Sequence, residues 1–314
     1  MLKVGLVGVG GISGAHIPAW EEMADAELVA LCDIRPERME KFEDKRCYTD
    51  FDEMLANEEF DIIDICLPTY LHADFAVKAM EKGINVITEK PISLKEEDID
   101  RVYKTAEKNN VKFMVAQVLR FWPEYELLKE IYETKKYGKL LSGTMTRLGC
   151  YPKWSWDGWM MDEKRSGLTP FDLHIHDLDF MVYAFGAPKK VAHQYRSKRP
   201  DQDFISVTYD FGDFSINSEA SWYATSYPFT AEFRFQFENA LVSNENGKMQ
   251  IFLRDGKIDL SADAEGDTGD INLPKSDAYA NEIKYFLDCV INDKAVEKVK
   301  SDELLAVLKI LNSL

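Results

Sequence analysis

A glycine-rich turn near the start of the sequence has the residue types and spacing needed to hold a phosphate group. Gly8, Gly10 and Gly11 follow the apolar residues 4–7 and precede a stretch with helical apolar spacing. A strand that turns through glycines into a helix lets backbone N–H groups approach a pyrophosphate, which the positive end of the helix dipole also attracts. Ser13 stands at the usual position of the third small residue. The pattern predicts a dinucleotide-binding turn.

An acidic residue follows this turn at the distance that ribose recognition requires. The strand-like residues 27–32 end in Asp33, 23 residues after Gly10. A carboxylate at about that distance accepts hydrogen bonds from the ribose hydroxyls; the alternative is a loop carboxylate that caps a helix near Pro36. Because a carboxylate repels a 2′-phosphate, Asp33 favours NAD, whereas Arg35 could contact the phosphate of NADP. We expect NAD as the cofactor and keep NADP open.

Glu89, Lys90 and Pro91 follow the strand-like residues 85–88. Parallel sheets bind ligands outside the carboxyl ends of their strands, so a lysine at this place can present its ammonium group to a ligand. The alternative is a solvated surface lysine. The Lys90–Pro91 peptide bond could be cis, because a bond before proline reaches that form easily.

Asp172 and His176 provide a candidate acid–base pair. Residues four apart share one face of a helix, and a carboxylate there can fix the tautomer of the imidazole and raise its basicity. His176 could then act as a general base. His174, Asp172 and His176 could instead bind a metal, but residues two apart on a helix point roughly 200° apart, so we expect no metal site. Histidines bonded within the core are the remaining alternative.

The order of strand-like and helical segments predicts two domains. Strands and helices alternate to about residue 120, which predicts a doubly wound, parallel Rossmann sheet of the α/β class. Seven strand-like runs between residues 191 and 260 predict a C-terminal α+β domain with a large, open, mostly antiparallel sheet. The expected domains are residues 1–120 and 121–314. The helices expected at 279–292 and 302–314 could pack back on the first domain.

The composition excludes some classes of partner. The 314 residues carry a net charge of −17, which argues against nucleic acid and anionic membrane surfaces as partners. No apolar run reaches the roughly 18 residues of a membrane span, and no signal peptide is visible. The five cysteines are scattered and lack zinc-ligand spacing. We expect a cytoplasmic protein that acts on a small molecule.

Taken in order, these motifs resemble those of one known family. Gly8-x-Gly10-x-x-Ser13, Asp33, Glu89-Lys90-Pro91 and Asp172-x-x-x-His176-Asp177 are similar to the pattern of the glucose–fructose oxidoreductase and inositol dehydrogenase family, also called Gfo/Idh/MocA. The resemblance extends over nearly the whole chain. It implies an NAD(P)-dependent oxidoreductase of sugars, inositols or related polyols, and a homodimer or homotetramer formed through the C-terminal sheet.

The resemblance also implies roles for individual residues. Lys90, Asp172 and His176 match the catalytic trio, with His176 as general acid or base, Asp172 orienting it and Lys90 polarising the reacting oxygen. His174 stands where many relatives have glycine. The expected cofactor contacts are Gly8, Gly10, Gly11, Ile12, Ser13, Asp33, Ile34, Arg35, Pro68, Thr69, His72, Glu89, Lys90 and Gln117. The expected substrate contacts are Arg120, Tyr151, Trp154, Trp159 and His174, although the aromatic residues could equally belong to the core.

Two other functions fit the same residues. One is a non-catalytic protein of this fold that senses NAD(P). The other is an enzyme that works in the opposite direction and reduces a carbonyl group or a double bond.

Overall fold

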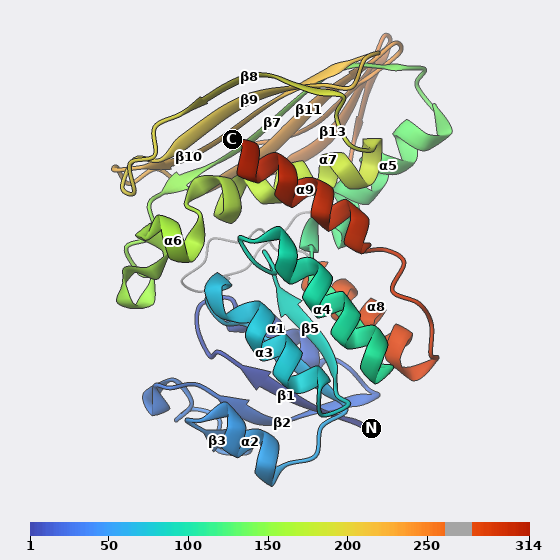
Figure 1. Ribbon diagram of the computed structural model, residues 1–314. Coiled ribbons are helices and arrows are strands. Elements are labelled where there is room, and N and C mark those ends of the chain that lie inside the picture. Colours follow the sequence, from blue (N-terminus) through green and yellow to red (C-terminus); the bar gives the residue numbers. More distant parts are fainter. Residues whose placement is uncertain (261–277) are drawn as a thin grey trace. The chain divides into compact units, whose positions relative to one another are not determined.

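The computed structural model describes residues 1–260 and 278–314, which divide into two compact units (Figure 1). Among the described residues, the first unit contains 1–118 and 278–305, and the second contains 119–260 and 306–314. The expected domains, 1–120 and 121–314, differ from these units mainly at the C-terminus. Helix α8 (Ala278–Ile291) groups with the first unit and packs against α1 (Ser13–Glu21).

The first unit contains a six-stranded parallel sheet with the strand order β3-β2-β1-β4-β5-β6. This order confirms the predicted doubly wound Rossmann sheet. The strands are β1 (Leu2–Val7), β2 (Ala26–Cys32), β3 (Arg46–Tyr48), β4 (Ile62–Ile65), β5 (Asn85–Glu89) and β6 (Phe113–Ala116). The connecting helices include α2 (Phe51–Asn57), α3 (His72–Met80) and α4 (Glu96–Asn109), with short 3-10 turns at Pro36–Arg38 and Thr69–Leu71.

Burial explains why most of these strands could be predicted and one could not. Every residue of β4 and β6 is buried, so these strands are almost continuously apolar. The edge strand β3 is only three residues long and largely exposed, so it has no apolar run. For that reason the sequence pattern does not predict β3.

The second unit contains an eight-stranded sheet with the order β14-β13-β12-β11-β7-β10-β9-β8. Only β7 and β10 pair in parallel, and the other neighbours are antiparallel, which confirms the predicted mostly antiparallel sheet. The strands are β7 (Leu140–Cys150), β8 (Lys190–Arg196), β9 (Phe204–Asp210), β10 (Ser215–Tyr223), β11 (Thr230–Phe237), β12 (Leu241–Glu245), β13 (Lys248–Leu253) and β14 (Gly256–Asp259).

Two helices, α5 (Pro123–Thr134) and α7 (Ile175–Phe185), pack together beside this sheet. Tyr125 of α5 makes edge contacts with Phe180 of α7 and with Phe233 of β11. A 3-10 turn (Val118–Phe121), a 3-10 segment (Trp156–Met161), α6 (Glu163–Ser166) and the last helix α9 (Ser301–Ser313) complete the described elements. None of the described helices is long and apolar enough to cross a bilayer.

Helix α7 is tied to its surroundings by two buried ion pairs. The guanidinium group of Arg120 donates to both carboxylate oxygens of Asp179, at 2.8 and 2.7 Å, and lies over the Tyr183 ring. Arg147 of β7 donates to Asp177 at 2.7 Å. Removing one partner of such a pair leaves an uncompensated charge without water, which is far more destabilising than replacing the whole pair by apolar groups.

We expect Asp179→Ala to lower the free energy of unfolding of the protein by about 3–5 kcal/mol, because it strands the buried charge of Arg120. Arg120→Met/Asp179→Leu should recover most of this loss. Urea denaturation followed by circular dichroism measures both. Lys104→Ala, which breaks an exposed ion pair with Asp100, is the control and should leave the midpoint nearly unchanged. An Asp179→Ala midpoint equal to that of the control would contradict the expectation.

Candidate functional site

The glycine turn of the first unit has the shape that a bound pyrophosphate needs. Gly8 has a φ of +94°, and a Cβ atom there would lie 2.5 Å from the carbonyl oxygen of Cys66, so no side chain fits. A Cβ atom on Gly10 would meet nothing within 4 Å, so this side of the turn is open. The Ser13 hydroxyl donates to the Gly10 carbonyl at 2.8 Å, which fixes the start of α1. A phosphate group fits an open backbone turn at a helix start.

Asp33, at the end of β2, joins the turn to the second strand. Its carboxylate accepts hydrogen bonds from the backbone N–H groups of Val9 and Arg35, at 2.8 and 2.9 Å. The Arg35 side chain also contacts this carboxylate, at 3.3 Å. A carboxylate has about four acceptor positions, so Asp33 can still accept ribose hydroxyls. Ile34, beside it, is mostly exposed.

The carboxyl ends of β4 and β5 are held together by His72. Its two ring nitrogens lie 2.7 Å from the Pro91 carbonyl oxygen and 2.6 Å from that of Leu67, and the side chain is buried. Both polar atoms of the ring therefore have protein partners, which disfavours the expected cofactor contact of His72, and that contact stays a prediction. The nearby Thr69 is buried, and so is Gln117 at the end of β6.

Lys90 directly follows β5 and is half-buried. Its backbone N–H donates to the Glu89 carboxylate at 3.1 Å, and the Lys90–Pro91 peptide bond is cis. The preceding Glu89 is buried and turned to the interior of the first unit. In the Glu89-Lys90-Pro91 segment, the Glu89 carboxylate is thus buried, whereas Lys90 keeps partial access to solvent.

In the second unit, Asp172 and His176 lie on the part of a helical segment that keeps access to solvent. Residues Pro170–His174 form a π-helical turn, and α7 begins at Ile175, whereas the sequence predicts one regular helix over 171–185. Both side chains are partly exposed, while Asp177 is fully buried. Isolated π-helical turns occur frequently at functional sites.

His174 and Arg120 are fully buried and have protein partners, so this arrangement disfavours their expected substrate contacts, which stay predictions. His174 is fully buried, with its ring nitrogens 2.6 Å from the Tyr209 hydroxyl and 3.3 Å from that of Ser218. Burial, reinforced by the positive charge of Arg147, lowers the pKa of His174 to about 3, so its ring is neutral. Arg120 is fully buried against Asp179.

The aromatic residues expected near the substrate divide into two groups. Tyr151 and Trp159 are partly buried and pack on a small apolar cluster that contains Met160 and Trp222. Trp154 is more than half exposed. Trp154 is thus the most accessible of the three.

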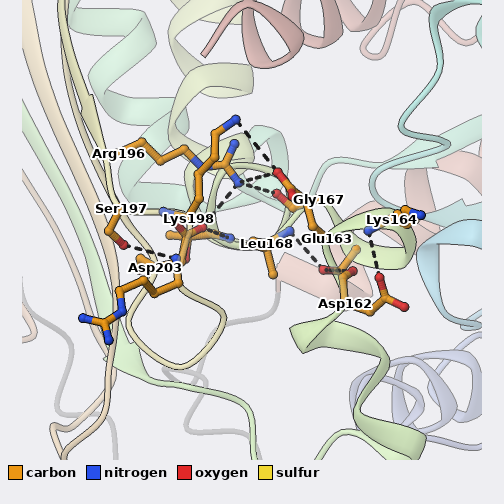
Figure 2. Close-up of polar contacts among 12 residues, drawn as sticks. Asp162, Glu163, Lys164, Gly167, Leu168, Arg196, Ser197, Lys198 and Asp203 are labelled. Carbon is orange, nitrogen blue, oxygen red and sulfur yellow. Dashed lines mark hydrogen bonds and ion pairs between the residues drawn. The ribbon is translucent and has the colours of Figure 1, made fainter.

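The segment before the π-helical turn is anchored by Asp203, which precedes β9 and is completely buried (Figure 2). Its carboxylate accepts from the backbone N–H groups of Thr169 and Lys198, at 3.0 and 2.9 Å, and Arg196 lies 3.5 Å away. The Thr169 hydroxyl donates to the Asp203 carbonyl at 3.0 Å. Leu168 is held at a φ of +60°, a value that only surrounding contacts can enforce in a residue with a branched side chain.

No motif or spacing in the sequence identifies Asp203 or Arg147 as functional residues. A charged residue that lies within an apolar strand, or directly before one, is a weak sign that it pairs with another buried polar residue. The spacing of residues in the sequence does not show which residue that is, because partners such as Arg147 and Asp177 are 30 positions apart.

Two family models match this chain. Residues 2–117 match an oxidoreductase family with an NAD-binding Rossmann fold, named GFO/IDH/MocA, and residues 125–242 match the GFO/IDH/MocA C-terminal domain. The chain is 30% identical to a 2,7-anhydro-N-acetylneuraminate hydratase from Mediterraneibacter gnavus, over 68% of this chain and 60% of that protein. It is 27% identical to a myo-inositol 2-dehydrogenase from Thermotoga maritima, over 59% of this chain and 55% of that protein.

The curated relatives match over only part of their length. The chain spans between about half and three fifths of the first of them. The similarity to solved structures extends over nearly the full length of both chains. The structure of a myo-inositol 2-dehydrogenase from Lactobacillus plantarum is similar with a TM-score of 0.80 and 22% identity, covering 99% of this chain and 95% of that one. This likeness establishes the fold.

We expect the protein to bind NADH at least about tenfold more tightly than NADPH, because the Asp33 carboxylate repels a 2′-phosphate. Asp33→Ser should narrow the ratio of the two dissociation constants, measured by titration of nicotinamide fluorescence. Glu37→Ala removes an exposed carboxylate of the next turn and should leave the ratio unchanged. Tighter binding of NADPH by the unmodified protein would overturn the preference.

We expect Asp203→Ala to loosen residues 162–174, because the buried N–H group of Thr169 loses its acceptor at a cost of about 1–3 kcal/mol. Hydrogen exchange read by mass spectrometry should be faster in peptides from this segment and unchanged in α8. Asp201→Ala, which removes an exposed carboxylate two residues earlier, is the matched control. Equal exchange in the two variants would show that Asp203 does not hold the segment.

Proposed function

Because the chain belongs to the GFO/IDH/MocA oxidoreductase family, we propose that it transfers a hydride between NAD and a sugar, an inositol or a related polyol. The observation that carries the proposal is that both family models match, each over one of the two units. Relatives named D-apiose dehydrogenase, myo-inositol 2-dehydrogenase and glucose-6-phosphate 3-dehydrogenase support the substrate class.

His176 is the proposed general acid or base of the reaction. In the oxidative direction it takes the proton of the substrate hydroxyl, and in the reverse direction it returns that proton. Asp172 orients the imidazole and balances the charge that it gains. The partial exposure of both side chains supports these roles, whereas the neighbouring His174 is buried and neutral.

Lys90 is the proposed electrophilic group. An ammonium group beside the reacting oxygen stabilises the negative charge that develops when the hydroxyl proton leaves. The hydrogen bond from the Lys90 N–H to the Glu89 carboxylate restrains the backbone at this residue. Lys90 is half-buried and directly follows the carboxyl end of β5.

The first unit would hold the cofactor through the glycine turn and Asp33. The N–H groups of residues 10–13 would face the pyrophosphate, and Asp33 would accept the ribose hydroxyls. Ile34, Arg35, Pro68 and Thr69 surround these groups and stay in the proposed set. When bound, NAD supplies the hydride acceptor or donor.

Among the aromatic residues proposed to contact the substrate, Trp154 is the most exposed and is therefore the first candidate. Tyr151 and Trp159 are secondary candidates.

The proposal extends to assembly and location. The open eight-stranded sheet would join two or four copies of the chain. All five cysteines are free, which suits a reducing compartment such as the cytoplasm.

A second candidate function is addition of water to a sugar derivative. The relative with 30% identity is named a hydratase, and an acid–base pair such as Asp172 and His176 is also what water addition needs. The two functions differ in the net change of the cofactor. A dehydrogenase reduces NAD in proportion to product, whereas a hydratase forms product without net reduction of NAD.

We expect Lys90→Ala and His176→Ala each to lower kcat by about 10²–10⁴-fold, the usual contribution of one acid, base or charge-stabilising group. The dissociation constant of NAD should stay nearly unchanged. The assay is nicotinamide absorbance with inositols, aldoses, sugar phosphates and a nucleotide sugar, combined with chromatography of the products.

Lys104→Ala, an exposed lysine of α4, is the matched control and should keep full turnover. Full turnover in both Lys90→Ala and His176→Ala would refute the assigned roles. Tight NAD binding without product from any compound would favour a non-catalytic, cofactor-sensing protein. Net oxidation of NADH with carbonyl or unsaturated compounds alone would favour a reductase.

A further inference from the structure

The first unit contains a buried group of three titratable side chains, which connects α1, the helix after the glycine turn, with Glu89 of the Glu89-Lys90-Pro91 segment. His16 projects from α1, Asp64 belongs to β4, and Glu89 ends β5. The His16 Nδ1 atom lies 2.8 Å from an Asp64 oxygen, and its Nε2 atom lies 3.0 Å from a Glu89 oxygen. His16 and Asp64 are completely buried, and Glu89 is nearly so.

This geometry fits a doubly protonated imidazole. Both ring nitrogens face carboxylate oxygens, and in the doubly protonated form each nitrogen donates a hydrogen bond to one of them. Burial is the largest single influence and lowers the pKa of His16, but the charges and hydrogen bonds of Asp64 and Cys66 together raise this pKa well above its usual value. Burial is the largest single influence and raises the pKa of Glu89, but the hydrogen bond and charge of His16, together with the charge of Lys90, lower this pKa below its usual value. The imidazolium of His16 therefore bridges two carboxylates.

Three further side chains, those of Trp20, Cys66 and Tyr279, lie around His16 and Asp64. The Trp20 indole N–H donates to the same Asp64 oxygen at 2.7 Å, and the Cys66 thiol donates to the other oxygen at 3.7 Å. The Tyr279 ring of α8 lies 5.7 Å from the His16 ring.

His16, Asp64 and Cys66 also have the side-chain types of a zinc site, and their ligand atoms lie within 4.8 Å of one another. Two observations favour a hydrogen-bonded cluster. Both His16 nitrogens already lie at hydrogen-bond distance from a carboxylate oxygen. Burial raises the pKa of the Cys66 thiol to about 12, whereas zinc binds the thiolate.

We propose that His16 is a positioning residue for Lys90, which acts by clamping the Glu89 carboxylate between its own imidazolium and the Lys90 N–H. One Glu89 oxygen is held by His16, and the other accepts the Lys90 backbone N–H at 3.1 Å. Helix α1, which starts at the glycine turn, is thereby tied to the backbone that carries the lysine. The inference rests on the proposed function, in which the Lys90 ammonium stabilises the reacting oxygen.

The test compares substitutions in two backgrounds. His16→Asn and Glu89→Gln each remove the clamp and should lower kcat about tenfold or more, with the dissociation constant of NAD changed by less than about threefold. In the Lys90→Ala background, the same substitutions should change the residual kcat by less than about twofold, because a residue that acts through Lys90 has no effect without it. If His16→Asn fails to fold, Glu89→Gln carries the test.

Trp20→Phe is the matched control, because it removes a hydrogen bond to Asp64 and leaves the Glu89 clamp in place. It should lower the melting temperature and leave kcat unchanged. The positioning role is overturned if His16→Asn and Glu89→Gln lower only the melting temperature, as Trp20→Phe does. It is also overturned if they lower kcat by the same factor in both backgrounds, or if the purified protein holds one equivalent of metal that His16→Asn abolishes.

Failure of the proposed function gives a different result. In that case Lys90→Ala itself keeps full turnover, and both proposals are overturned together. If Lys90→Ala is inactive and the clamp variants are fully active, only the inference about His16 is wrong.

Discussion

A charge that is cut off from water needs an opposite charge beside it, and this requirement fixes the segments that carry the candidate chemistry. In the first unit, the His16 imidazolium lies between Asp64 and Glu89. In the second, Arg147 pairs with Asp177, the residue next to His176. Such pairs add little net stability, because desolvation offsets their attraction. What they provide is a single permitted arrangement, since any displacement separates charges in a medium that cannot screen them.

Backbone constraints act in the same places and in a complementary way. Gly8 lets β1 approach the end of β4 so closely that no Cβ atom fits between them. Leu168 holds a left-handed conformation just before the π-helical turn, where Asp203 and Thr169 bind the chain to the start of β9. Strained backbone persists only where neighbouring contacts enforce it. The pairing of buried charges and the strained turns therefore support each other.

The sequence predicted most of what depends on local patterns. The glycine turn, the alternation of strands and helices, and the position of Lys90 at a strand end all follow from periodicity and spacing. The sequence could not predict the partner of a buried polar residue, because His16 contacts Asp64 and Glu89 across 48 and 73 positions. It also could not separate His174 from His176. Both have the right side chain, and only the fold decides which of them is buried.

In the Glu89-Lys90-Pro91 segment, the contacts of the two outer residues determine how the middle residue is held. Glu89 points inward to His16, the Pro91 carbonyl oxygen meets a ring nitrogen of His72, and both contacts are completely internal to the first unit. Lys90, between them, is the member that keeps access to solvent. Each neighbour of the lysine is thus held by a different buried histidine. A lysine whose backbone is held on both sides has less backbone conformational entropy to lose on binding any ligand than a lysine on a free loop.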